Sequence, residues 1–283
     1  MNNIAVFPNM DKDPKLEFTK EVVNEILKYD KTVFLSEALA DKEKVDGAVY
    51  LPEKEIFEKS DLIVSLGGDG TVLNTAKDAA MYSIPVMGIN IGHLGFLTQA
   101  ERGDLSVFAY VFSGNYTINK SMLLEVSVCK DGKELESYLG FNDVVIRGSY
   151  SKMVTLNISV DGTVMNEYVA DGVIFSTANG STAYSMSAGG PIVHPKLDCM
   201  LISPICPHTL SARSVVIPTE STISAKAVPP YRCDAVLTVD GEKVHTLERD
   251  EYVTVKKSEK HTMLLNIPQR NFFDIVREKL NFR

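Results

Sequence analysis

The segment best suited to chemistry is a glycine-rich turn, Gly67-Gly68-Asp69-Gly70-Thr71, which follows an apolar run ending at Leu66 and precedes a helical pattern. In open α/β sheets, ligands bind where a strand ends and a helix begins. Glycines there let the backbone approach a phosphate, and the N–H groups of the first helical turn point at it. Asp69 would repel phosphate, so its carboxylate is suited to accepting a hydroxyl proton or holding a metal ion. The turn predicts phosphoryl transfer to an alcohol; the structural alternative is a tight turn in which Asp69 caps the helix.

Two familiar nucleotide-binding motifs are absent from the sequence. No GxxxxGK(S/T) pattern occurs, and Gly88, Gly92 and Gly95 do not have the GxGxxG spacing of a dinucleotide fingerprint. These two binding schemes are therefore excluded.

A second polar region combines the Asn142-Asp143 pair with the neutral segment 176–184, which is rich in hydroxyl and amide groups. A ribose diol needs donors and acceptors at fixed positions, and adjacent amide and carboxylate groups supply both. The alternative for the pair is a turn before the strand-like run at 144–146.

The first part of the chain must place the glycine-rich turn at a sheet edge. Strand-like runs alternate there with helical periodicity, at residues 4–7, 14–29, 33–35, 62–64, 71–82 and 85–89. This alternation predicts a Rossmann-like α/β domain, with a parallel sheet covered on both faces.

The pattern changes after residue 120. Strand-like runs now meet at the pairs Asp131-Gly132, Asp161-Gly162 and Asp240-Gly241, which favour tight hairpins. We expect an antiparallel β-sandwich domain over 120–255, after an α/β domain over 1–119. Residues 271–282 return to helical spacing, and we expect the segment 256–283 to pack back on the first domain.

Composition excludes several classes of protein. The formal charge is −8 without a long Lys/Arg block, which disfavours nucleic-acid binding, and the uncharged stretch 172–195 is too polar for a membrane span. No signal peptide precedes the first strand-like run, and Cys129, Cys199, Cys206 and Cys233 form no CxxC pair, so we expect a reduced, cytoplasmic, zinc-free protein. We interpret His93 and His208 as structural histidines and Cys206 as a packed thiol.

Seven motifs follow one another in the order found in bacterial NAD kinases, between about residues 61 and 220. They are the glycine-rich turn, Gly92-His93-Leu94-Gly95-Phe96-Leu97-Thr98, Asn142-Asp143, Ala170-Asp171-Gly172, Gly180-Ser181-Thr182-Ala183-Tyr184, Ser187-Ala188-Gly189-Gly190-Pro191-Ile192-Val193 and Ile205-Cys206-Pro207-His208. The chain therefore resembles the bacterial ATP/polyphosphate-NAD kinase family. The first motif alone is less specific, because diacylglycerol-type lipid kinases, sphingosine kinases and phosphofructokinases carry a similar turn.

The resemblance implies a transferase that moves a phosphoryl group from ATP, or from polyphosphate, to the 2′-hydroxyl of the adenosine ribose of NAD and produces NADP. Asp69 would help to deprotonate that hydroxyl, with Gly67, Gly68 and Thr71 near the phosphates. The resemblance places on NAD the residues Gly70, Leu73, Phe96 (against the adenine), Asn142, Asp143, Asp171, Asn179, Thr182, Ala183 and Tyr184.

The resemblance also implies an oligomer. Asp171 would reach the nicotinamide end of NAD from a neighbouring subunit, so we expect a homodimer or homotetramer with shared sites. Few cations lie near the motifs, and we therefore expect a divalent metal ion, Mg²⁺, carried in with ATP; protein ligands for a metal are not recognisable.

The sequence departs from the family pattern at Val169, Ala178-Asn179, Gln99 and Ser214, none of which touches Asp69. These departures bear on affinity for NAD and for the donor. Two other functions remain as alternatives: a lipid or sugar kinase with the same turn, which the neutral 176–184 segment disfavours, and a non-catalytic dinucleotide sensor.

Overall fold

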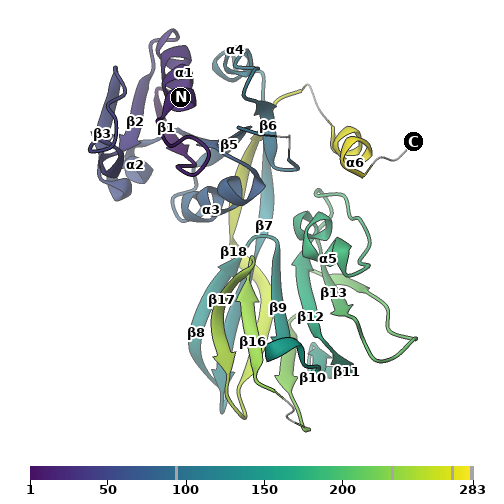
Figure 1. Ribbon diagram of the computed structural model, residues 1–283. Helices are drawn as coiled ribbons and strands as arrows, with labels where there is room; N and C mark the ends of the chain where they lie inside the picture. The colour runs from purple at the N-terminus through teal and green to yellow at the C-terminus, as the bar shows by residue number, and fades with distance from the viewer. Residues whose placement is uncertain (93–94, 231–232, 269–270, 281–283) are drawn as a thin grey trace. The chain divides into compact units, whose positions relative to one another are not determined.

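The computed structural model describes residues 1–92, 95–230, 233–268 and 271–280. The chain forms two compact units, Met1–Lys120 with His261–Arg283, and Ser121–Lys260. The division falls inside two long strands, β7 (Thr117–Lys130) and β18 (Tyr252–Asn266), each of which contributes residues to both units (Figure 1). Each unit has a hydrophobic core of its own.

The first unit is the predicted α/β domain with a parallel sheet. Its strands are β1 (Asn3–Pro8), β2 (Thr32–Ser36), β3 (Ala48–Leu51), β4 (Leu62–Leu66), β5 (Pro85–Asn90), β6 (Thr98–Glu101) and the end of β18. The order is β3-β2-β1-β4-β5, with β6 and β18 both paired to β5. Every residue of β4 is buried, because helices cover both faces of the sheet.

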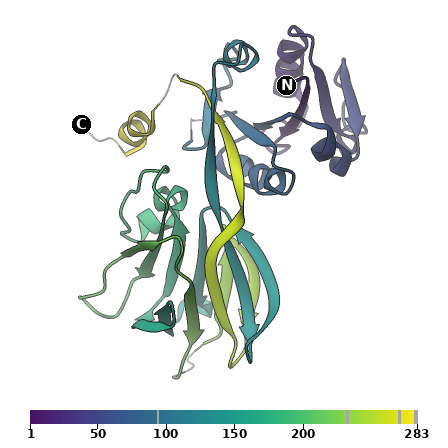
Figure 2. The ribbon, with the colours of Figure 1, turned by 180° about the vertical axis from the view of Figure 1, so that it is seen from behind.

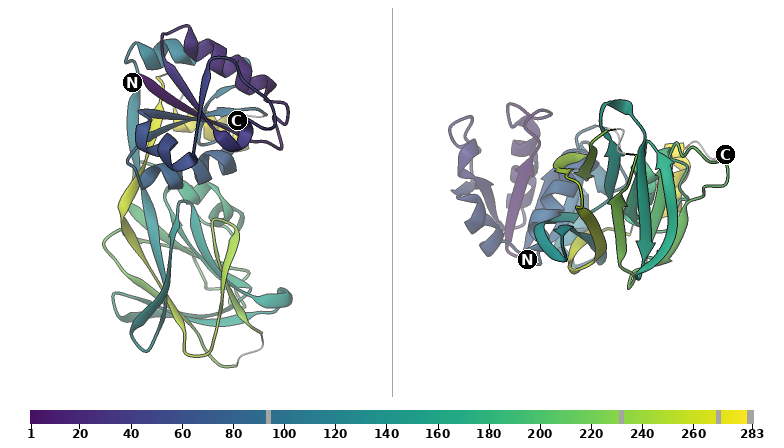
Figure 3. Two further views of the ribbon diagram at one scale, coloured as in Figure 1. Left: turned by 90° about the vertical axis from the view of Figure 1, so that its left-hand side faces the viewer. Right: turned by 90° about the horizontal axis from the view of Figure 1, so that it is seen from below.

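The helices of the first unit are α1 (Glu17–Leu27), α2 (Glu53–Lys59), α3 (Asp69–Ala80), α4 (Val107–Phe112) and α6 (Phe272–Leu280), with a short 3₁₀ turn at Glu37–Leu39. The first and fourth pack on one face of the sheet, and the second and third on the other (Figure 3). The C-terminal helix α6, predicted over 271–282, groups with this unit; residues 281–283 lie outside the described ranges. In those ranges, no helix is both long and apolar enough to cross a membrane.

The second unit is the predicted antiparallel β-sandwich. One sheet has the order β14-β13-β12-β9-β16-β17. Its strands are β9 (Asp143–Gly148), β12 (Gly172–Thr177), β13 (Cys199–Ile205), β14 (Val215–Pro218), β16 (Ala235–Val239) and β17 (Glu242–Leu247). Val144 and Ile146 of β9, and Val173 and Phe175 of β12, point into the core. The alternating residues Val145 and Ile174 occupy the other face.

The facing sheet joins β11 (Thr163–Ala170), β10 (Val154–Val160) and β15 (Ile223–Ala227) to β18, which also pairs with β7; β8 (Lys133–Gly140) pairs with β7. Figure 2 shows β7 and β18 running side by side. The three Asp-Gly pairs make hairpins, as predicted: Asp131, Asp161 and Asp240 have φ of 52°, 51° and 50°. Both residues of each pair adopt the left-handed geometry that a two-residue hairpin requires.

Candidate active site

The glycine-rich turn leads directly from β4 into α3. The Gly67 N–H donates to the Ile89 carbonyl at 2.9 Å, and Gly68 precedes the first helical residue. A Cβ on Gly67 would lie 2.3 Å from Thr71 Oγ1, so the turn can fold back on its helix only with glycine there. The first N–H groups of a helix have no partner within it. Gly68, Gly70 and Thr71 therefore surround a helix start that is suited to bind phosphate.

Asp69 is the first residue of α3 and does not cap it. Its carboxylate accepts hydrogen bonds from the backbone N–H groups of Phe96 (2.8 Å) and Leu97 (3.0 Å) instead. A Cβ on Gly95 would lie 1.8 Å from Asp69 Oδ1, so glycine is needed where the two segments meet. The capping alternative is therefore wrong: the carboxylate holds a loop that is distant in sequence.

The same contact joins the backbone of Phe96, whose ring is the predicted adenine wall, to the predicted catalytic acid. Phe96 is half-buried on the loop that Asp69 holds, and Gly70 is exposed. Leu73 is buried within α3. His93 and Leu94, from the same sequence motif as Phe96, lie outside the described residues.

In the second unit, the Asn142-Asp143 loop is tied to the end of β12. The Thr177 N–H donates to the Asn142 carbonyl at 3.0 Å, the Thr177 hydroxyl donates to the Phe141 carbonyl at 2.9 Å, and the Gly180 N–H donates to that hydroxyl. A Cβ on Gly180 would lie 1.9 Å from the Asn142 oxygen. The structure thus brings Asn142 and Asp143 next to the predicted 179–184 segment.

That segment forms a 3₁₀ turn, Asn179–Thr182, followed by α5 (Tyr184–Ser187). The Thr182 hydroxyl donates to the Asn179 carbonyl at 3.1 Å, and Tyr184 is 40% exposed. Ser181 ties this segment to Val193: its buried hydroxyl donates to the Val193 carbonyl and accepts from the Val193 N–H. These two hydrogen bonds hold the polar groups of the segment in position.

Asp240 is a residue that the sequence identified only as part of a hairpin turn. Its carboxylate accepts from the backbone N–H groups of Phe141, Asn142 and Asp143, at 2.7 to 3.2 Å. A further bond runs from its own N–H to the Asp143 carbonyl at 2.9 Å. Asp240 therefore shapes the loop that presents the predicted ribose ligands, and the Asp-Gly pair was the only local signal.

Asp143 is held in a costly environment for a carboxylate. It is 5% exposed, and burial, followed by repulsion from Asp240, raises its pKa to about 6, against an opposing hydrogen bond from the Tyr184 N–H. Its neighbour in strand register is Ser176, whose buried hydroxyl has no hydrogen-bond partner in the part of the chain that the structure describes. Perturbed, buried polar groups of this kind gather at functional sites.

Asp171 is placed elsewhere. It is exposed at the turn before β12, whereas Asp143 pairs with Ser176 near the other end of that strand. Five residues of strand separate the two ends by about 17 Å. Within the second unit, the structure therefore does not bring Asp171 to the Asn142-Asp143 loop.

The remaining cysteine and histidine candidates, Cys206 and His208, are exposed in the loop after β13. Cys206 follows β13 with φ 44° and is exposed, so the expectation of a packed thiol is wrong: the left-handed backbone turns it outward at the strand end. His208 is exposed in the same loop. Among the described residues, no group of three or more His, Cys, Asp or Glu side chains could hold a metal ion.

Comparison with known proteins matches both units. Residues 8–109 match the ATP-NAD kinase N-terminal domain, and residues 141–267 match the ATP-NAD kinase C-terminal domain. The chain is 40% identical to an NAD kinase of Thermoanaerobacter sp. strain X514, over 100% of both chains. It is 39% identical to an NAD kinase of Caldanaerobacter subterraneus subsp. tengcongensis, again over 100% of both.

Two solved structures are similar. Yeast NADH kinase complexed with NADH has a TM-score of 0.86 at 27% identity, covering 100% of this chain and 88% of that chain. An Archaeoglobus fulgidus NAD kinase in complex with ATP has a TM-score of 0.73 at 24% identity, covering 99% and 98%, and supports the fold alone. With both domain families matched in order, and with relatives of this similarity over the whole length, the chain belongs to the ATP-NAD kinase family.

Proposed function

We propose that this NAD kinase phosphorylates the 2′-hydroxyl of the adenosine ribose, with Asp69 accepting the hydroxyl proton. The observation that carries the proposal is the fixed position of the Asp69 carboxylate, held by two backbone N–H groups beside Phe96 at the start of α3. Each carboxylate oxygen can accept about two hydrogen bonds, so lone pairs remain for a substrate hydroxyl. A base already in place saves the cost of positioning it.

For the acceptor, we propose that Asn142 and Asp143 hold the ribose hydroxyls. The hydrogen bonds that the Asp240 carboxylate accepts from this loop, and the one that the Thr177 hydroxyl donates to it, support this role, because they fix the loop before any ligand arrives. The assignments of Gly70, Leu73, Phe96, Asn179, Thr182, Ala183 and Tyr184 to NAD are part of the same proposal. Gly67, Gly68 and Thr71 are assigned to the phosphates.

Mg²⁺ is proposed as a companion of the donor. Because the described residues offer no cluster of metal-binding side chains, they do not fit a resident metal site. The ion would arrive bound to the triphosphate, whose charge it neutralises. We also propose a cytoplasmic location, which the four unpaired cysteines support.

The proposed reaction is tested by incubating the purified protein with NAD, ATP and Mg²⁺. We expect NADP to form from NAD and no phosphorylated product to form from 2′-deoxy-NAD, because that analogue lacks the nucleophile. Mass spectrometry of both mixtures measures the outcome. A phosphorylated product from the deoxy analogue would contradict the 2′ assignment, and binding of NAD without turnover would favour the sensor alternative.

For the oligomer, we propose that Asp171 serves the site of a neighbouring subunit, which its distance from the Asn142-Asp143 end of β12 supports. Asp171→Ala and Asp69→Asn chains should each be nearly inactive alone. Mixed by co-refolding or subunit exchange, they should regain up to about a quarter of the wild-type rate, because half of random pairs are mixed and each has one intact site. No regain in a mixture with exchange confirmed by mass spectrometry would exclude shared sites.

A further inference from the structure

A buried pair of polar side chains lies on the face of the β9–β12 sheet that points away from the core. Val144 of β9 and Phe175 of β12 point into the core, so their strand neighbours Asp143 and Ser176 point to the other face. Both are buried there, with Asp143 5% exposed and Ser176 0%. The backbone of the α5 segment closes over them, because the Tyr184 N–H donates to the Asp143 carboxylate.

The two side chains face each other across the strand pair. Ser176 and Asp143 are direct partners in the antiparallel register of β12 and β9. Side chains at such positions have Cβ atoms about 4.5–5.5 Å apart, so rotation about χ1 brings a serine hydroxyl within reach of an opposite carboxylate. The Ser176 hydroxyl nevertheless has no hydrogen-bond partner among the residues that the structure describes. Buried hydroxyls are nearly always paired, because an unpaired one gives up its hydrogen bonds to water without replacement.

The Asp143 carboxylate is a suitable acceptor for this hydroxyl. Burial, followed by repulsion from Asp240, opposes its ionised form and raises its pKa to about 6, and the Tyr184 N–H acts in the other direction. The N–H groups of residues 141–143 cannot help, because they donate to Asp240 instead. Ribose hydroxyls donate best to an ionised carboxylate, so a further donor to that carboxylate would strengthen their binding.

We propose that Ser176 is a positioning residue for NAD, whose hydroxyl donates to the Asp143 carboxylate when the ribose is bound. The inference rests on the proposed function, in which Asp143 accepts from the ribose hydroxyls. The bond stabilises the charged form of Asp143 and fixes the orientation of its carboxylate, and it also gives the Ser176 hydroxyl a partner. Ser176 does not touch NAD in this arrangement and acts through Asp143.

The test compares Ser176→Ala with Ser149→Ala. Ser149 carries another buried hydroxyl that is unpaired among the described residues, and it follows the opposite end of β9, about 20 Å along the strand from Asp143. Both variants remove an unpaired hydroxyl, so both should have a thermal midpoint at or above the wild-type value. Only Ser176→Ala should weaken NAD binding and raise the KM for NAD, by about tenfold with kcat unchanged, because the complex loses a hydrogen bond to a charged group.

The pH dependence of NAD binding separates this role from simple packing. Asp240 is the charged neighbour of Asp143, whereas β12 and α5 present it with the Ser176 hydroxyl and the Tyr184 N–H. Protonation of Asp143 removes the charge that the hydroxyl stabilises, so the difference in NAD affinity between Ser176→Ala and the wild type should be complete at pH 7 and shrink below about pH 6. Ser176→Cys, which keeps the shape of the side chain but is a weaker donor, should bind NAD with intermediate affinity.

NAD binding is measured by calorimetry without ATP, so the readout does not depend on turnover, and Ser176→Ala is repeated in the Asp143→Asn background. There it should add little, because its partner carries no charge. Loss of NAD affinity in Asp143→Asn but not in Ser176→Ala would overturn this inference alone. Wild-type affinity in Asp143→Asn would contradict the proposed ribose contact and this inference with it. A lowered thermal midpoint in Ser176→Ala, with an affinity loss that is equal at pH 5 and pH 7, would show a packing role and overturn the positioning role.

Discussion

Replacing Asp69 with Asn should lower kcat by about 10²–10⁴, the usual loss when a general base is removed. Asn keeps the size of the side chain and one acceptor oxygen, so the bond from one of the two loop N–H groups can persist. NAD affinity should change little, because the proposed ribose ligands lie in another part of the chain. Steady-state kinetics, NAD binding and the thermal midpoint, measured on one preparation, check the result.

Asp13→Asn is the matched control for this substitution. Asp13 is also an aspartate of the first unit that accepts from two backbone N–H groups, those of Phe18 (3.2 Å) and Thr19 (2.8 Å), and it is 5% exposed. It should lose about 1–3 kcal/mol of stability, with kcat unchanged. An Asp69→Asn variant that folds, binds NAD and turns over near the wild-type rate would contradict the base assignment. The pH and Mg²⁺ dependence of a slow variant separates proton acceptance from metal holding.

The sequence predicted the glycine-rich turn better than the start of the helix beside it. Periodicity placed that start near Thr71, but α3 begins at Asp69. Glycine disfavours helix by about 1 kcal/mol, so a local pattern excludes Gly70 from it. Asp69 and Phe96, which are in contact, lie 27 residues apart in the sequence. No local window of sequence contains both.

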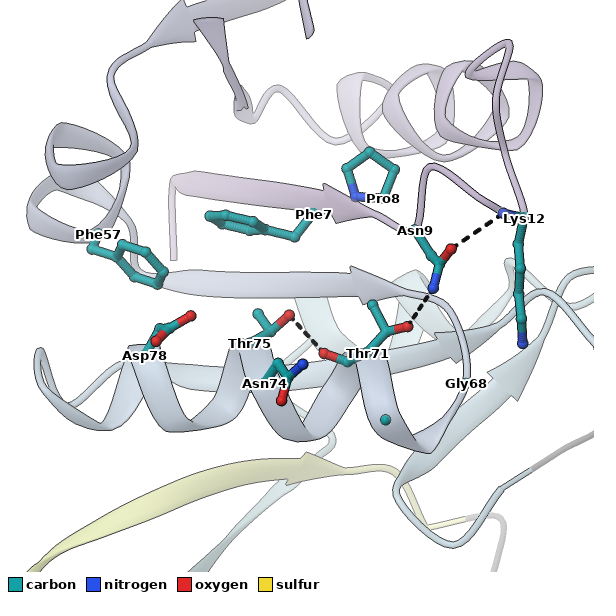
Figure 4. A pocket seen from close by; sticks show the side chains of 11 residues that line it. Phe7, Pro8, Asn9, Lys12, Phe57, Gly68, Thr71, Asn74, Thr75 and Asp78 are labelled. Carbon is teal, nitrogen blue, oxygen red and sulfur yellow. Dashed lines mark hydrogen bonds between the residues drawn. The ribbon is translucent and has the colours of Figure 1, made fainter. Parts of the chain in front are cut away.

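Short elements were also missed. α2 and β3 have seven and four residues, too few for a periodic pattern to stand out, and α4 has six. The omission of α2 mattered, because this helix supplies Phe57, which lines the cavity beside the glycine-rich turn (Figure 4). The sequence indicated the strands and the glycine-rich turn, but a cavity depends on side chains from elements that only the fold brings together.

Asp240 illustrates the same limit in the second unit. Its pairing with Gly241 correctly predicted a hairpin, since a left-handed aspartate before glycine has a local cause. In its second role, its carboxylate accepts hydrogen bonds from the N–H groups of residues 141–143, which joins positions nearly 100 apart. Because the hairpin alone explains the Asp-Gly pair, nothing in the local sequence indicates that Asp240 also has a long-range role.

Because the Asp143 carboxylate is buried, replacing it should change the affinity for NAD and the stability of the fold in opposite directions. Asp143→Asn should weaken NAD binding by about 10- to 100-fold, because hydrogen bonds to a charged group contribute about 1.5–3 kcal/mol. The same variant should be more stable than the wild type at pH 7. The carboxyl pKa of about 6 in the folded state, against an ordinary value of 3.8, means that ionisation opposes folding by up to about 3 kcal/mol.

The stability difference between Asp143→Asn and the wild type should depend on pH. Because the folded state holds the Asp143 proton more tightly than the unfolded state, the stability contributed by this group falls as pH rises from about 4 to about 6 and stays low above that. The stability advantage of Asp143→Asn should therefore be absent below pH 4 and complete at pH 7, as measured by denaturant unfolding across the range. NAD binding by the wild type should weaken below pH 6, and binding by the variant should not respond.

Asp61→Asn gives a control of the opposite sign. The Asn2 and Asn3 N–H groups donate to the Asp61 carboxylate and lower its pKa, so its ionised form favours folding. That variant should lose stability at pH 7 and bind NAD as the wild type does. An Asp143→Asn variant that is destabilised at pH 7 like Asp61→Asn would show that the carboxylate is held for the fold and not for a ligand. Stability gained together with affinity lost would show instead that the fold keeps a buried charge because NAD requires it.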